Sequence, residues 1–315
     1  MSAGTGAPPR FSLMTELATD RPGTVARPVI KPAKEPLARR AVPWLLLAPV
    51  FAIMIYAFLA PLLIFLEYSF WRFEYGKLIE DFTFETYVEF LTDPYFHTIV
   101  FDTLRMALIT TICSVLVGYP LAYALWRITR PGLQRWFGLI IFSPILVSVV
   151  VRSYGWTVLL ADQGPVNWFL QTVLHFPEPV RLVFNLTGVV ISLTHVFLPF
   201  VVFPIYSTMT RLDPTLREAA MDLGAGWWTT FRRVTFPLTL PGLLAGAQIA
   251  FTLALGAFVT PQLLGGGRVL VLPLQVFQAT TDINWPLAAV GGIALLLLAM
   301  ITVAVSNRLL RYSEV

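Results

Sequence analysis

The chain has 315 residues, of which 57% are hydrophobic and 13% are charged. Because a soluble domain carries about 25% charged residues, this composition excludes an ordinary soluble globular fold. The net charge of +4 does not suggest nucleic-acid binding, and the single cysteine, Cys113, excludes an intrachain disulfide.

The first 40 residues are rich in Pro, Ala and charged side chains and contain no apolar run of the kind found in a cleaved signal peptide. We expect residues 1–40 to form a disordered cytoplasmic tail. We expect the remainder, residues 41–315, to form one transmembrane domain.

Six long apolar runs follow this tail. A helix needs about 20 apolar residues to cross the hydrocarbon core of a bilayer. Continuous runs also argue against a transmembrane barrel, whose strands are short and alternate in polarity. The expected fold class is therefore all-α, a polytopic membrane protein with six transmembrane helices at about 43–69, 104–126, 136–160, 183–209, 240–263 and 285–307.

The basic residues between these runs are distributed unevenly. Lys and Arg concentrate before the first run, at 127–135, at 211–233 and at 308–311, whereas the first loop on the other side is acidic. Because cytoplasmic loops carry the excess of Lys and Arg, both termini and the segment after the fourth run are expected in the cytoplasm.

That segment, residues 211–240, is a polar stretch between two apolar runs. Asp213 and Pro214 are typical of a helix start, since Asp caps free N–H groups and Pro suits the first helical position. Gly224 and Gly226 are expected to end this helix. Its expected apolar face consists of Leu216, Ala219, Ala220 and Leu223.

A second short helix is expected after the glycines, with Trp227, Phe231 and Val234 on one face. Pro237 and Pro241 are expected to close it and to open the fifth span. The whole segment is predicted to form a helix–turn–helix at the membrane surface. Two roles for this helix–turn–helix are open: it docks a partner, or it is an amphipathic hairpin that only anchors the spans.

The segment resembles the EAA loop of binding-protein-dependent ABC importer permeases. The matching positions are Glu218, Ala219, Ala220, Gly224, Phe231, Pro237 and Pro241, and Gly226 departs from the Ser found in many relatives. The resemblance implies the type I importer permease fold, with a coupling loop at 211–240 that sits in a cleft of a separate ATPase subunit. The residues it assigns to coupling are Glu218, Ala219, Ala220, Asp222, Gly224, Phe231 and Pro237.

Other stretches are similar to the spermidine/putrescine-type subfamily: 118–123, 152–156, 164–167, 265–268 and 284–287. Pro273 and Leu274 depart from the Ala-Asn usual in that subfamily. The resemblance implies a small solute (a polyamine, an opine or an amino-acid-like compound), a bacterial inner-membrane location, and three kinds of protein partner. These are an ATPase dimer, a second and related permease, and an external solute-binding protein.

The chain lacks the Gly-x-x-x-x-Gly-Lys-Ser/Thr phosphate-binding sequence. We therefore expect no catalytic site for ATP in this chain, and the resemblance implies that ATP and Mg²⁺, the only cofactors expected, are bound by the partner ATPase. No cysteine pair or His cluster offers a metal site, so we expect no metal. Membrane lipid is the remaining expected partner.

Candidate pathway or gate residues lie near span ends and at the outer segments: Arg152, Tyr154, Trp156, Asn167 and Trp285. Arg152 is either an outer gate or a structural residue. Aromatic faces would attract a cationic solute, although an interfacial aromatic belt explains Tyr and Trp at these places equally simply.

Two other functions remain open at this point. A stand-alone secondary transporter would need acidic or histidine side chains deep in the bundle, and the last three runs have no Asp or Glu in their cores. An intramembrane enzyme would need a nucleophile–base pair or a metal constellation, and neither pattern occurs.

Overall fold

The computed structural model describes residues 37–313, and the surroundings of side chains from residue 47 to residue 308. Most of the predicted tail, residues 1–36, lies outside the described residues. Residues 37–40 belong instead to the first helix. The chain divides into two units between Ala57 and Phe58, and the first helix contributes to both.

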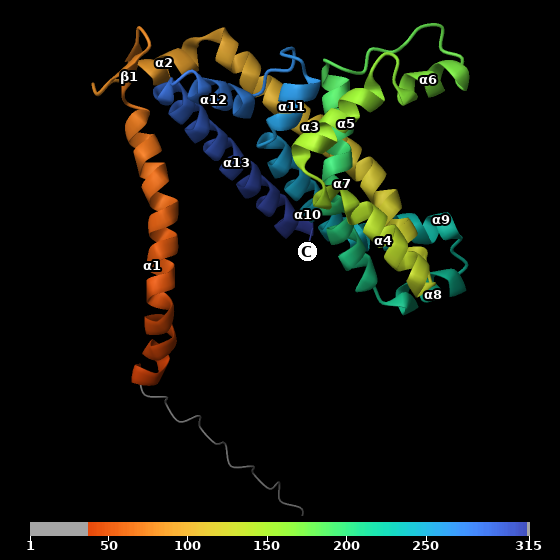
Figure 1. Ribbon diagram of the computed structural model, residues 1–315. Coiled ribbons are helices and arrows are strands. Elements are labelled where there is room, and N and C mark those ends of the chain that lie inside the picture. The colour runs from red at the N-terminus through yellow and green to blue at the C-terminus, as the bar shows by residue number, and fades with distance from the viewer. Residues whose placement is uncertain (1–36, 314–315) are drawn as a thin grey trace, which may run out of the picture. The chain divides into compact units, whose positions relative to one another are not determined.

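The elements follow one another in the order shown in Figure 1. They are α1 (Leu37–Tyr68), β1 (Arg72–Glu74), β2 (Lys77–Ile79), α2 (Glu85–Thr92), α3 (Pro94–Arg127), α4 (Pro131–Leu146), α5 (Val149–Leu160), α6 (Pro165–Thr172), α7 (Leu186–Thr210), α8 (Pro214–Asp222), α9 (Trp227–Thr230), the π-helix η1 (Phe231–Thr235), α10 (Phe236–Leu255), α11 (Val259–Leu264), α12 (Leu272–Thr281) and α13 (Trp285–Ser313).

The prediction of an all-α polytopic membrane protein is confirmed, apart from one small antiparallel hairpin. That hairpin pairs Arg72 with Ile79. Among the described residues, five helices are long and apolar enough to span a membrane, and there are six spans when a bent pair of helices is counted as one. The five are α1, α3, α7, the run from Trp227 to Leu255, and α13.

The third predicted span, 136–160, is not one continuous helix. It is split into α4 and a segment that begins with α5, and the bend between Pro131–Leu146 and Val149–Thr172 is 104°. Pro144 has no N–H to donate to the carbonyl of Ile140. The hydroxyl of Ser143 donates to that carbonyl instead, at 2.8 Å. Val147 and Ser148 then adopt extended conformations, which end the helix.

The fifth predicted span, 240–263, is also placed differently. Helical backbone runs without a loop from Trp227 to Leu255 and stops at Gly256, so Pro237 and Pro241 do not close a helix as expected. The chain widens into the π-turn η1 just before Pro237. Wide turns of this kind accommodate a proline whose missing N–H would otherwise interrupt the helix.

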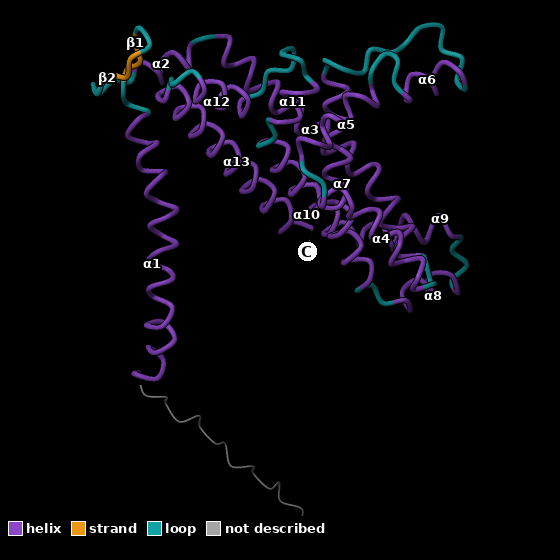
Figure 2. The backbone as a smooth tube through the Cα atoms, viewed as in Figure 1, coloured by secondary structure: helices purple, strands orange, loops and turns teal. Residues whose placement is uncertain are grey.

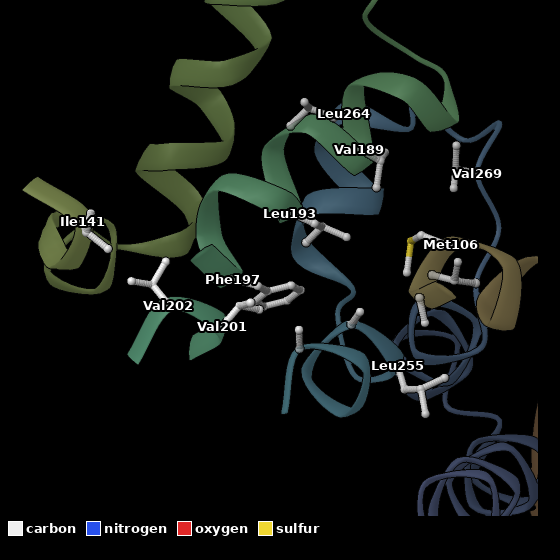
Figure 3. Packing of buried hydrophobic residues seen from close by; sticks show 14 of the residues in the cluster. Met106, Ile141, Val189, Leu193, Phe197, Val201, Val202, Leu255, Leu264 and Val269 are labelled. Carbon is white, nitrogen blue, oxygen red and sulfur yellow. The ribbon is translucent and has the colours of Figure 1, made fainter. Parts of the chain in front are cut away.

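The core of the second unit lies where α3, α7 and α10 pack together. Figure 3 shows Met106, Leu193, Val201 and Leu255 converging from these three helices. Glycines let the backbones approach closely: a Cβ on Gly118 would lie 2.9 Å from Val201 Cγ1, and one on Gly246 would lie 3.0 Å from Val201 O.

The two ends of the second unit carry its polar segments. Figure 2 shows loops at the end that holds the β1–β2 hairpin and α6, and again around α8 and α9 at the opposite end. The hairpin end has its own small core, in which Phe90 and Phe96 pack with Leu272 and Val290. Thr103 fastens α3 to this end by accepting the N–H of Leu272 at 2.8 Å.

Candidate functional site

The polar segment after α7 folds into the helix–turn–helix that its sequence predicts. Asp213 caps α8, its Oδ1 accepting the N–H of Thr215 at 3.0 Å, and Pro214 occupies the first turn. The backbone hydrogen bond from Thr215, assisted by that residue's hydroxyl, lowers the pKa of Asp213 below its ordinary value. The predicted helix start is confirmed.

Gly224 ends α8 for a conformational reason. Its φ of +82° lies in the left-handed region, which side chains other than glycine rarely adopt. Its N–H bonds to Met221 O at 2.9 Å, and the N–H of Ala225 bonds to Ala220 O at 3.0 Å. This paired arrangement is the Schellman motif, so Gly224 serves the turn itself, whatever it contacts outside the chain.

The outward side of α8 has no cover within the described chain. No residue of α8 is buried, and the following Leu223 is 90% exposed. Leu216 is also exposed, as are Glu218 and Asp222 on the same helix. An exposed apolar strip beside carboxylates, on a structured loop, is the surface that a protein partner uses.

The inward side of the loop is held to the end of α3. The guanidinium of Arg217 lies over the ring of Trp126, 4.9 Å from its centroid. Such cation–π contacts contribute about 0.5–1 kcal/mol at exposed sites. Arg217 therefore ties α8 to α3 while Glu218, the next residue, faces outward.

A second attachment is a cluster of rings that we call the aromatic junction: Tyr119, Tyr123, Trp227, Phe231 and Phe236. Phe231 is its centre, with ring centroids 6.0 Å from Tyr119, 5.6 Å from Tyr123, 5.8 Å from Trp227 and 6.4 Å from Phe236. The junction joins η1 to α3, two segments more than 100 residues apart in the sequence.

Next to the junction, the hydroxyl of Tyr119 lies 2.9 Å from the hydroxyl of Thr239 on α10. Thr239 is fully buried, so this hydrogen bond lies between packed helices. The loop, α3 and α10 thus meet at one place, and the loop contacts two spans there.

A second feature lies where two helices are interrupted. A cleft of about 230 Å³, which we call the central cleft, is lined by Val149 at the start of α5, by Phe197 on α7, and by residues 256–260. The α10–α11 break lines the cleft directly, and Val149, which also lines it, comes immediately after the α4–α5 break. Interrupted helices at membrane depth are typical of solute and ion sites in transporters.

Arg152 holds the first of these breaks in place. Its guanidinium donates to Pro144 O and, at 3.3 Å, to Val147 O, the last carbonyls of α4. A cation suits this position because the C-terminal end of a helix carries partial negative charge. Ser153, the next residue, joins α5 to α11 through a contact of 3.1 Å with Thr260.

The other candidate pathway residues do not form one group. Trp156 donates to His195 Nδ1 at 3.3 Å, and Tyr154 is exposed. Asn167 is fully buried, and its amide bonds to the backbone of Ala161 and Val180. Its geometry is that of a clamp on the outer segment.

Trp285 lies apart, at the start of α13. Its ring centroid is 6.4 Å from Phe65 and 6.1 Å from Tyr68, both on the last turns of α1. The sequence did not single out Ser153, Thr260 or Tyr119, because their partners are distant in the chain. Tyr119 and Ser153 do lie in stretches that resemble the subfamily, 118–123 and 152–156, but that resemblance gave neither residue a role.

Comparison with known proteins decides the family. The family described as "Binding-protein-dependent transport system inner membrane component" matches residues 37–314. The chain belongs to this family. It is the membrane-spanning permease of an ABC importer, a multi-pass inner-membrane subunit that works with an ATPase and a solute-binding protein.

Two curated relatives match most of the permease. It is 34% identical over 218 residues to the spermidine/putrescine transport system permease protein PotB of Escherichia coli (strain K12), covering 68% of this chain and 78% of the relative. It is 32% identical over 263 residues to PotB of Haemophilus influenzae, covering 83% of this chain and 91% of the relative.

The fold of the permease is also found in a solved structure. A chain of a bacterial ABC transporter involved in the import of the acidic polysaccharide alginate superposes with a TM-score of 0.71 at 18% identity, covering 88% of this chain and 98% of that one. At this identity the likeness concerns the fold alone. The family assignment favours an importer permease over a stand-alone secondary transporter or an intramembrane enzyme.

Proposed function

We propose that α8 and the following turn of the permease dock on a separate ATPase dimer, which binds ATP and Mg²⁺ and drives transport. The observation that carries this proposal is the uncovered strip of Leu216, Leu223 and Glu218. The small side chains of Ala219 and Ala220 allow a partner's backbone to approach closely. Asp222, Gly224, Phe231 and Pro237 complete the proposed coupling set by shaping and holding the loop.

The proposed orientation places α8 in the cytoplasm. Four arginines, at positions 211, 217, 232 and 233, lie in or beside the loop, as the positive-inside rule requires of a cytoplasmic segment. With this orientation and the spans described above, the N-terminal end of α1 and the C-terminal end of α13 are also cytoplasmic.

The proposed route for the solute passes the central cleft. Residues 256–258 line the cleft, as does Val149 just after the break at 147–148, so movement of α5 or α11 alters the width of the cleft without unfolding a span. Arg152 sets the position of the first break, while Tyr154 and Trp156 follow it on α5. A second, related permease closes the route on its open side, and the solute-binding protein delivers the solute at the hairpin end.

The proposed cargo is a small organic amine of the polyamine type. The PotB relatives are spermidine/putrescine permeases, and the central cleft presents the rings of Phe197 and Phe258, whose faces attract ammonium groups. The cleft also adjoins the end of α10 at Leu255, where a helix carries partial negative charge.

The docking proposal is tested by co-purification and by uptake. Glu218→Lys should abolish retention of the ATPase on the permease and abolish ATP-dependent uptake. Glu89→Lys is the matched control for ATPase retention, because it makes the same charge reversal at an exposed position on α2, at the opposite end of the permease, and should leave that retention unchanged. Uptake by the permease alone in liposomes would overturn the requirement for an ATPase.

The cargo is tested separately. The partner solute-binding protein is titrated with spermidine, putrescine, an opine and a basic amino acid, and the same compounds compete for uptake by the whole transporter. Tight binding and competition by the amines alone support the proposal. Selective binding of an opine or an amino acid would reassign the cargo and leave the coupling mechanism intact.

A further inference from the structure

A second concavity lies between α3, α4 and α7, away from the central cleft and from the outward side of α8. It has a volume of about 240 Å³, and its walls include Gln134, Arg135, Gly138, Phe142, Phe203 and Tyr206. We call it the α4 groove. Its lining residues belong neither to the central cleft nor to the aromatic junction.

One end of the α4 groove is polar and basic. Gln134 Nε2 donates to Tyr206 Oη at 3.0 Å and to Leu125 O at 3.3 Å, and Arg135 stands beside it. Arg127 ends α3 and Arg130 lies in the short connection that precedes α4. The sequence has no Asp or Glu between Asp102 and Asp162. The positive charge at this end therefore has no acidic neighbour along the chain.

The other end of the groove is apolar. Gly138 forms an open floor, because no heavy atom lies within 4 Å of where its Cβ would be. Phe142 and Phe203 form the walls, and Phe203 is 56% exposed. Trp136, beside the basic end, is 67% exposed, as is usual for a tryptophan at the boundary between headgroups and hydrocarbon.

The change from cationic to apolar along the groove follows the depth profile of a phospholipid. We propose that the α4 groove binds an anionic phospholipid of the cytoplasmic leaflet, with its phosphate at Arg135 and an acyl chain along Gly138, Phe142 and Phe203. Basic pockets between membrane helices bind anionic headgroups in this way. The uncapped first turn of α4 adds N–H groups that favour an anion.

This proposal rests on the cytoplasmic orientation of the α3–α4 connection and on neither the cargo nor the ATPase contact. The bound lipid would also hold α4 against α7. It would thereby steady the helix whose far end is the break at Val147.

The test is native mass spectrometry of the whole transporter, released from mixed phosphatidylglycerol and phosphatidylethanolamine. The wild type should retain phosphatidylglycerol in preference. Arg135→Gln should weaken that retention about fivefold, the contribution of one basic residue at an anionic surface, and leave phosphatidylethanolamine unchanged. Gly138→Leu, which fills the floor and keeps every charge, should abolish retention of this lipid.

Two matched controls accompany these variants. Arg308→Gln removes an exposed arginine near the end of α13, and Gly292→Leu adds the same volume at another open glycine. Neither should alter lipid retention. Equal retention in wild type, Arg135→Gln and Gly138→Leu would overturn the proposal.

A cross-linking experiment separates lipid from protein as the occupant. Gly138→Cys, made with Cys113→Ala, should react with a lipid-soluble maleimide and form no cross-link to the second permease. A cross-link to that subunit would overturn the proposal and make the groove a subunit interface. Both readouts are independent of transport, so either can fail while the coupling function stands.

Discussion

Phe231 offers the sharpest test of how the coupling loop is connected to the spans. Its ring touches four other members of the aromatic junction and also lies 5.5 Å from the ring of Trp228. Removing a phenylalanine side chain from a full core costs about 3–5 kcal/mol. Phe231 is only half-buried, so we expect Phe231→Ala to weaken the attachment of the loop to α3 by about 2 kcal/mol, roughly half of that range.

A loss of about 2 kcal/mol corresponds to a roughly 30-fold shift in the equilibrium between an attached and a detached loop. Phe231→Leu keeps most of the apolar volume and loses the ring contacts, which contribute about 0.5–1.5 kcal/mol beyond area burial. Its effect should therefore be smaller, near fivefold. Phe82→Ala is the control, since Phe82 belongs to a ring cluster with Phe70 and Phe84 near the hairpin.

The assay compares ATP hydrolysis with uptake by the assembled transporter in proteoliposomes. Phe231→Ala should leave ATPase binding and basal hydrolysis in place but reduce solute moved per ATP, with Phe231→Leu intermediate. Co-purification first confirms that each variant assembles. If Phe231→Ala transports with the wild-type ratio, the junction does not carry motion from the loop to α3, and the reasoning fails.

Three further outcomes follow from the geometry. Arg152→Gln should lower the thermal midpoint of the transporter, because the carbonyls at the end of α4 lose a cationic donor. An unchanged midpoint together with unchanged uptake would show that Arg152 does not hold the α4–α5 break in place. Because the folded pKa of Asp213 is depressed, its contribution to α8 is complete above the ordinary carboxyl pKa and is lost as pH falls through the folded value. ATPase retention should therefore be flat from pH 8 to 5, whereas Asp213→Ala should weaken it throughout; a wild-type decline within that range would refute the assignment. Gly246→Val should destabilise the bundle by about 1–3 kcal/mol, since its side chain would meet the backbone of Val201, and denaturation in detergent that matches the wild type would show that the helices separate easily.

Local chemistry made much of the coupling loop predictable. Asp213 and Pro214 specify a helix start, and Gly224 specifies a left-handed turn, through interactions within a few residues. The same signals predicted the short connection to a second helix. The apolar runs likewise predicted the number of spans, because hydrocarbon thickness sets their length directly.

The interruptions were not predictable from hydropathy. Residues 136–160 form one largely apolar run, and hydropathy alone does not place the break at Val147 and Ser148. Arg152, the charged residue within the run, follows that break and bonds back across it to Pro144 O and Val147 O. The opposite error occurred at Pro237, which was expected to end a helix. There the π-turn absorbs the missing N–H, and the helix continues for almost another 20 residues.

The other features that the sequence did not predict depend on contacts between distant segments. The meeting of Tyr119 with Phe231 and Thr239 depends on how α3 and α10 cross, and no local pattern encodes that crossing. Asn167 is a second residue whose contacts could not be predicted from its local sequence. Its pathway role stays a prediction, whereas its three hydrogen bonds to the backbone of Ala161 and Val180 join two distant parts of the outer segment, which no local pattern indicated.

The unbroken helix from Trp227 to Leu255 makes the coupling loop one end of a rigid lever. The part beyond η1 has 20 residues, about 30 Å of helix. A pivot of about 10° at the π-turn would swing the far end by about 5 Å. That end is Gly256, at the wall of the central cleft. A small rotation at the proposed ATPase surface would therefore become a displacement comparable to the width of a small solute.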